Sequence, residues 1–137
     1  MKSFCSPRRF LIWDYSVSHA QLLLRSAKEG EAQNSLNIDL VFSGVFYVEL
    51  RESLNGIRLV SPTQTELARL ESRSRIRQDG THTFFGILSN GERFFVGASH
   101  LKVAENTLGP KETSLDFPMY SSETDEEKGG RKGVSPP

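Results

Sequence analysis

Residues Thr83 to Ala98, with the sequence TFFGILSNGERFFVGA, contain two runs of aromatic and aliphatic residues separated by Asn90-Gly91. An Asn-Gly pair supplies the two positive φ angles of a type I′ turn, which is the strongest short-range signal for a β-hairpin. A two-residue loop also sets the strand register. It predicts three opposite pairs on one face: Ser89 with Glu92, Ile87 with Phe94, and Phe85 with Val96.

The other face of this hairpin places each glycine opposite a ring, Gly86 opposite Phe95 and Gly97 opposite Phe84. A glycine leaves room for a ring of the paired strand to cover the backbone. Both faces therefore carry apolar rings, and the hairpin is predicted to lie deep in the domain. We expect four residues of the first face to be buried together: Phe85, Ile87, Phe94 and Val96.

Upstream of the hairpin, the segment from Asn37 to Leu50 is rich in β-branched and aromatic residues and is interrupted by Ser43-Gly44. A glycine inside a strand pattern predicts a bulge that bends the strand. Residues 20–25 are expected to pair with this segment, and a short strand is expected over residues 57–60.

A helix of two to three turns is predicted after Pro62, which suits the first helical position. Thr63 and Glu66 match a capping box, and Leu67 and Leu70 would face the core. The predicted fold class is α+β and mainly antiparallel. We expect a small bent sheet or partly open barrel of about six or seven strands with one covering helix.

The composition changes at about Asn106. Residues 107–137 contain few apolar side chains and include an acidic run from Glu123 to Glu127. Such a segment cannot bury enough surface to offset its chain entropy. We therefore predict a single β-rich domain over residues 1–106 and a disordered polar tail after it. Within that tail, the short segment from Leu115 to Tyr120 could dock on the domain.

The 137 residues carry 17 basic and 17 acidic side chains, so the formal net charge is zero. This balance argues against nucleic acid or an anionic membrane as a partner. The apolar run that begins at Phe10 stops at Asp14, which is too short for a signal peptide or a membrane span. Cys5 is the only cysteine, so no intrachain disulfide can form, and a reducing, cytoplasmic location is expected.

The segment WDYSVSH, Trp13 to His19, contains Asp, Ser and His, the residue types of a hydrolytic triad. Its apolar and polar residues alternate, which predicts a half-buried strand with both aromatic residues and Val17 on one face. In such a strand Asp14 and His19 would lie about 16 Å apart. Successive triad members need hydrogen bonds of roughly 2.6–3.2 Å. We therefore predict a strand here and no catalytic residue.

The three histidines, His19, His82 and His100, are not accompanied by a spaced cysteine pair or a His-Glu-x-x-His run. No metal site is therefore expected. The sequence also lacks a phosphate-binding glycine motif between a strand and a helix, and no cofactor is predicted.

Arg69, Arg73 and Arg77 would share one helical face if the helix extended that far. Basic side chains beside aromatic rings can bind single-stranded nucleic acid. Glu66 and Glu71 interrupt the run, however, and a solvated helix face is the simpler interpretation. The candidate binding residues are aromatic, imidazole and guanidinium side chains: Trp13, Tyr15, His19, Tyr47, Arg69, Arg73 and Arg77.

The leading hypothesis is a non-catalytic protein-interaction module of a small intracellular protein, with another protein as its partner. It rests on the lack of a catalytic, metal or nucleotide motif in the sequence. The alternative is small-ligand or single-stranded nucleic-acid binding through the barrel mouth or the arginine-rich helix. The hypothesis that the protein is an enzyme of an unrecognised type is also left open. A deep pocket with converging polar groups would favour a ligand or an enzyme, and a flat apolar patch would favour a protein partner.

Overall fold

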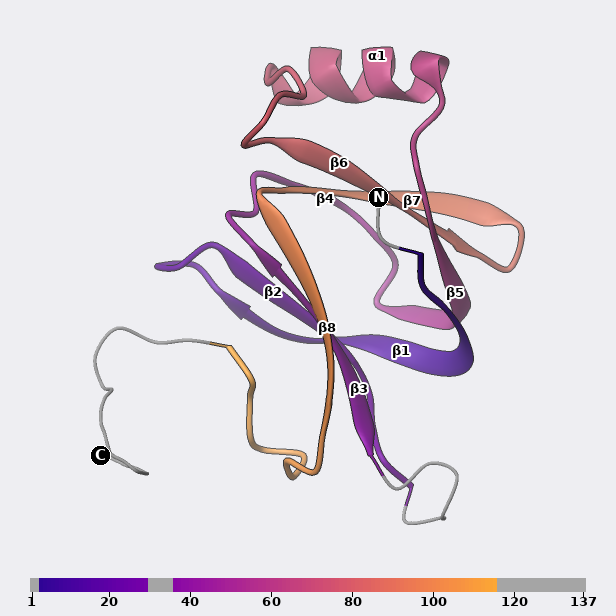
Figure 1. Ribbon diagram of the computed structural model, residues 1–137, viewed down its shortest axis with the longest axis vertical. Coiled ribbons are helices and arrows are strands. Elements are labelled where there is room, and N and C mark those ends of the chain that lie inside the picture. The colour runs from indigo at the N-terminus through magenta and orange to yellow at the C-terminus, as the bar shows by residue number, and fades with distance from the viewer. Residues whose placement is uncertain (1–2, 30–35, 116–137) are drawn as a thin grey trace.

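The computed structural model describes residues 3–29 and 36–115 (Figure 1). These residues form eight strands and one helix, which confirms the α+β, mainly antiparallel class with more strands than predicted. In chain order the elements are β1 Cys5–Ser16, β2 Gln21–Ser26, β3 Asn37–Ser43, β4 Tyr47–Glu49, β5 Ser53–Val60, α1 Gln64–Ser74, β6 Thr83–Ser89, β7 Glu92–Ala98 and β8 His100–Asn106.

All eight strands belong to one sheet with the order β4-β7-β6-β5-β1-β2-β3-β8, and neighbouring strands are antiparallel. The chain itself links the two ends of this order, because β3 leads into β4 and β7 leads into β8. Two backbone hydrogen bonds support the link, from Ser99 N–H to Ser43 O and from Phe46 N–H to Gly97 O. The sheet is therefore bent strongly enough to resemble a partly open barrel (Figure 1).

Gly44 lies at the bend between β3 and β4, with a φ of 69° that favours glycine. From Ser43 to Tyr47 there are four residue steps, while the opposite segment, from Gly97 at the end of β7 to His100 at the start of β8, has three. The segment around Gly44 therefore has one residue more than the segment opposite it, and the chain bends there. The interruption also divides the predicted strand into two, which contributes to the higher strand count.

The β6–β7 hairpin has the predicted turn and register. Asn90 and Gly91 have φ angles of 55° and 78°, and every predicted pair is formed. Ile87 and Val96 are fully buried in the main core, while Phe85 and Phe94 are half-buried at its border. The prediction that these four residues cluster is therefore confirmed, although two of them are less enclosed than expected.

The nearest neighbours of the hairpin glycines differ from those predicted. A Cβ atom at Gly97 would lie 2.6 Å from the ring of Phe46, and one at Gly86 would lie 2.7 Å from the carbonyl oxygen of Val60. Both contacts come from segments outside the hairpin. The glycines therefore allow other parts of the chain to approach the hairpin closely, rather than serving the rings of the paired strand.

Helix α1 lies along β6 and covers the outer face of the hairpin (Figure 1). Its Leu70 is fully buried and packs in one cluster with the buried rings of Phe84 and Phe95. The predicted capping box is present, with Thr63 as the N-cap. Pro62 therefore precedes the cap, and its prediction as the first helical residue is wrong.

The ordered chain extends beyond the predicted boundary at Asn106. Residues 107–115, here called the strap, pack across the outer face of β2 and β3, and Leu115 is only 5% exposed. Leu115 contacts Leu23 and Val41 there. Leu115, where the predicted docking segment begins, therefore docks on the sheet. Residues 116–137 lie outside the described residues.

Candidate functional site

The second half of β1 contains a β-bulge. Its register against β2 shifts between Ile12 and Asp14, so Trp13 is an extra residue. Ile12 and Tyr15 are consequently paired with β2 residues that belong to the main core, and they lie on that face of the sheet. Trp13 packs on the opposite face, with the cluster under the strap. The predicted strict alternation, with both aromatic residues on one face, is therefore wrong.

One edge of β1 carries exposed apolar side chains. The ladder with β5 ends at Leu11, and one further hydrogen bond joins Ile12 N–H to Glu52 O. Beyond that point, no other strand among the described residues pairs with this edge. Ile12, Tyr15 and Val17 are 39%, 45% and 81% exposed. Ile12 and Tyr15 lie on β1 and Val17 lies in the turn that follows it, and the three are here called the apolar edge. They are three of the five large apolar side chains that are exposed in the described chain.

The chain turns after Ser16, so the predicted strand does not reach His19. The turn places Ser18 Oγ 3.0 Å from His19 Nδ1 and 3.5 Å from Ser16 Oγ. In a regular strand His19 would point away from both serines, so the prediction of a strand is wrong for this part of the segment. Asp14 does not join them, because its carboxylate accepts a hydrogen bond from the next backbone N–H. The exposed turn thus places the Ser18 hydroxyl beside the His19 imidazole, next to Val17 of the apolar edge.

A buried ion pair lies beneath the strap, between Arg25 on β2 and Asp39 on β3. Their side chains are 1% and 0% exposed, and two hydrogen bonds of 2.7 and 3.0 Å join them. Burial opposes ionisation of Asp39, but hydrogen bonds from Arg25 and Asn106 outweigh it and hold the pKa of the carboxyl below its usual value. Asp39 is therefore ionised at neutral pH.

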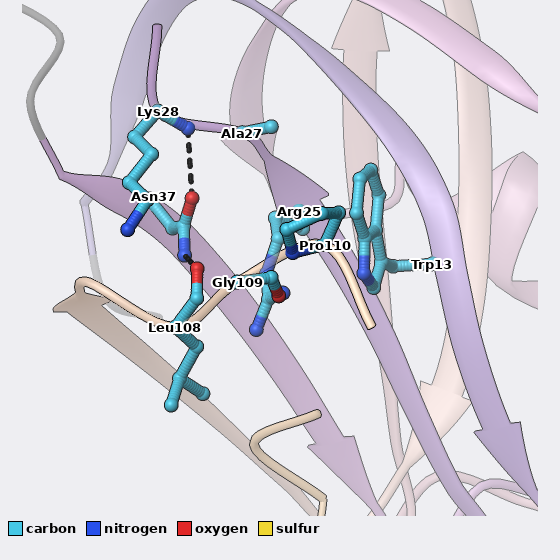
Figure 2. Close-up of a pocket in the computed structure, with 8 residues that line it drawn as sticks. All are labelled: Trp13, Arg25, Ala27, Lys28, Asn37, Leu108, Gly109 and Pro110. Atoms are coloured by element: carbon cyan, nitrogen blue, oxygen red, sulfur yellow. Dashed lines mark hydrogen bonds between the residues drawn. The ribbon is translucent and has the colours of Figure 1, made fainter. Parts of the chain in front are cut away.

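The same group of side chains binds the strap through its backbone. Figure 2 shows Asn37 between the backbone of Lys28 and that of Leu108, with a hydrogen bond to each. The acceptors on the strap are main-chain carbonyl oxygens, so these contacts do not depend on its side chains. Three side chains donate to them: Arg25 to Gly109 and Glu112, Asn37 to Leu108, and Lys28 to Thr107.

A cavity of about 140 Å³ lies between Trp13 and the strap, with Pro110 on its far side (Figure 2). The guanidinium of Arg25 lies 5.3 Å from the centroid of the Trp13 ring, which is cation–π distance. Sites for small molecules usually enclose roughly 300–1,000 Å³. This cavity is therefore smaller than the sites that usually hold a small molecule or a cofactor.

Tyr47 and Arg69 meet at the junction of β4 and α1. Tyr47 donates a hydrogen bond of 3.0 Å to Glu49, and Arg69 lies 3.1 Å from the same carboxylate. Burial, together with the bond to Glu49, raises the pKa of the Tyr47 phenol. Arg69 also lies 5.5 Å from the centroid of the Phe95 ring. These contacts bind α1 to the sheet, which is a structural role.

The three predicted arginines do not share one helical face. Helix α1 ends at Ser74, and Arg75 follows in the left-handed conformation with a φ of 61°. Arg77 therefore lies beyond the helix, and only Arg69 and Arg73 belong to it. Arg73 is exposed in the last turn, where a cation suits the helix dipole.

The structure thus separates the predicted binding residues into three places. Trp13 lies under the strap, and Tyr15 and His19 lie at the apolar edge and its turn. Tyr47, Arg69 and Arg73 lie at α1, with Arg77 beyond its end. Sequence reasoning missed Arg25 and Asp39. Their signal was a single charged residue next to the apolar run of each strand, because buried charges are rarely found without a partner.

Comparison with known protein families, characterised proteins and solved structures found no match to this chain. Within residues 3–29 and 36–115, no His, Cys, Asp or Glu side chains gather in a group of three that could hold a metal ion. The one helix in these ranges is too short to cross a membrane.

Proposed function

We propose that this protein is a non-catalytic interaction module that binds another protein through the apolar edge of β1. The carrying observation is the exposure of Ile12 and Tyr15 on a β1 edge that has no pairing partner among the described residues, together with that of Val17 in the turn that follows. Unpaired edges with apolar side chains favour association, and concentrated apolar exposure marks interaction sites.

The bulge at Trp13 supports binding through side chains rather than through a long added strand. A bulge at a sheet edge disrupts the ladder and increases its twist, so a partner could pair with only a short stretch. Tyr15 offers a large ring with a polar end, a combination that is enriched at protein interfaces. Covering the apolar edge would contribute about 25 cal/mol for each Å² of apolar surface removed from water.

The alternative function has less support. The cavities around Trp13 and beside Pro62 enclose about 140 and 240 Å³, which is below the usual range for small-molecule sites. Arg69 is held by Glu49, and the formal net charge is zero, so a basic groove for nucleic acid is weakly developed. Neither observation favours a ligand or an oligonucleotide over a protein.

The test is photocrosslinking in cells of the protein's own source, with a benzophenone amino acid at position 15 of the full chain. A discrete crosslinked protein is expected, and Val17→Asp should remove it. The matched control carries the benzophenone at Leu36, another exposed apolar position away from the edge. Equal crosslinking from both positions, or crosslinking mainly to nucleic acid, would contradict the proposal.

A further inference from the structure

All six residues of β2 are buried, which requires cover on both faces of the strand. Leu22 and Leu24 face the main core. Leu23 and Arg25 face the other way, and the strap covers them. A face of the sheet that would otherwise be exposed therefore holds an extended piece of backbone.

Few side chains of the strap contribute to its contacts with the sheet. Leu115 is its one fully buried apolar side chain, and it fills the space between Leu23 and Val41. Pro110, Lys111 and Glu112 are exposed. The other described hydrogen bonds to the sheet run from its side chains to main-chain carbonyls. The buried hydroxyl of Ser114 also interacts with Asp39 and lowers the pKa of that carboxyl. A peptide with the same backbone path, a similar aliphatic side chain and a small hydroxyl residue before it could make these contacts.

The strap also fits loosely against Trp13. Hollows of about 140 and 240 Å³ are both lined by Trp13 and Pro110, the second with Asp14 on its wall. Both hollows are open to solvent and large enough to hold water, so the strap is not closely packed against Trp13 there. The strap is therefore attached by a few polar bonds and one side chain rather than by close packing along its length.

We propose that the outer face of β2 and β3 is a peptide-binding site, and that the strap is a built-in occupant which a partner's segment replaces. The partner segment would accept the hydrogen bonds of Lys28, Asn37 and Arg25 through its carbonyls. It would place a leucine-sized aliphatic side chain between Leu23 and Val41. This inference rests on the proposed function, since it assumes a protein partner, and it specifies the kind of segment that the partner supplies.

The strap competes as an intramolecular ligand. It follows β8 without an intervening linker, because Asn106 ends the strand and Thr107 begins the strap. Short tethers give effective concentrations in the millimolar range or above, so a free peptide would not displace an intact strap easily. The site should become measurable when the strap is weakened at its apolar anchor.

The experiment uses the full chain with Leu115→Asp and the fluorescence of Trp13, the only tryptophan. Detachment of the strap should shift the Trp13 emission to longer wavelength. A capped peptide with the sequence of residues 107–115, TLGPKETSL, should then reverse the shift in a saturable way. The same peptide with aspartate as its last residue should not. Lys111→Asp, a charge change at an exposed strap position, is the matched control and should behave like wild type, with no response to the peptide.

Two results would overturn the proposal: an unchanged Trp13 emission in Leu115→Asp, or no saturable effect of the peptide up to its solubility limit. If Leu115→Asp does not unfold cooperatively, Leu115→Ala replaces it, with the same expected response at higher peptide concentration. Crosslinking from Tyr15 reports on the apolar edge and does not require the strap to leave. Failure of this inference can therefore be told apart from failure of the proposed function.

Discussion

The β6–β7 and β2–β3 hairpins are both covered on their outer faces, but by different means. Helix α1 covers the first through apolar contact, with Leu70 against the rings of Phe84 and Phe95. The strap covers the second through backbone hydrogen bonds that centre on the Arg25–Asp39 ion pair. Helix α1 is therefore held mainly by apolar packing, and the strap mainly by a few hydrogen bonds.

This difference has a consequence for stability. Apolar packing weakens gradually as atoms are removed or shifted. A buried ion pair depends on both partners, because loss of one leaves an uncompensated charge. We therefore expect α1 to behave as part of the core and the strap to attach or detach as a unit.

Removal of the carboxylate under the strap should have the largest effect. Asp39→Ala leaves the Arg25 guanidinium buried without its partner, and we expect a loss of about 3–5 kcal/mol in the free energy of unfolding. Chemical denaturation measures the loss, and Trp13 emission should shift in the folded variant because the strap detaches. A loss below about 1 kcal/mol, the size typical of exposed positions, would show that the ion pair does not hold the strap.

Leu70→Ala should weaken the other cover by about 2–5 kcal/mol, since it opens a cavity under α1. The same denaturation experiment measures it, with Leu67→Ala as a control of smaller effect because Leu67 is only partly buried. The Trp13 emission of the folded variant should match that of wild type. A shift in emission would mean that the two covers are coupled.

Phe94→Ala should cost about 1–3 kcal/mol, less than the roughly 3–5 kcal/mol for a fully enclosed ring, because Phe94 is half-buried at the border of the core. Phe95→Ala, on the face under α1, should reach the higher range because its ring is fully buried. Equal losses from the two variants would contradict the burial difference between the two faces of the hairpin.

The smallest loss of stability is expected on acidification, and no such loss is expected at neutral pH. The pKa of Asp39 is lowered in the fold from an ordinary value of about 3.8. Its ionised form therefore contributes stability above about pH 4, and this contribution is lost as pH falls through the lowered folded value. Trp13 emission followed during acid titration should shift below about pH 4. In Asp39→Asn the shift should no longer depend on pH, and an unchanged acid transition in that variant would contradict the assignment.

The first hairpin could be predicted because its information is local. Asn90-Gly91 determines the turn, and the turn determines every pair within sixteen residues. The capping box of α1 is equally local, with Thr63 and Glu66 three positions apart. In both cases the residues that decide the structure are neighbours in the sequence.

The second hairpin and its cover depend on distant residues. Arg25 and Asp39 are 14 positions apart, and Arg25 binds strap carbonyls 84 and 87 positions away. The strap composition, judged by itself, predicts a solvated tail, because its bonds use the backbone. The apolar edge was missed for another reason: the bulge at Trp13 has no glycine or proline to indicate it, and one extra residue reverses the predicted faces.

Native-state hydrogen exchange on the full chain, resolved by residue, tests most directly the claim that the strap is a replaceable cover. Four strap amides are hydrogen-bonded within the strap or to Asn106: those of Leu108, Gly109, Glu112 and Leu115. We predict that they exchange together, with an opening free energy well below that of the α1 amides around Leu70. Strap amides as well protected as those of α1 would contradict this account, since the strap would then open only when the whole domain unfolds.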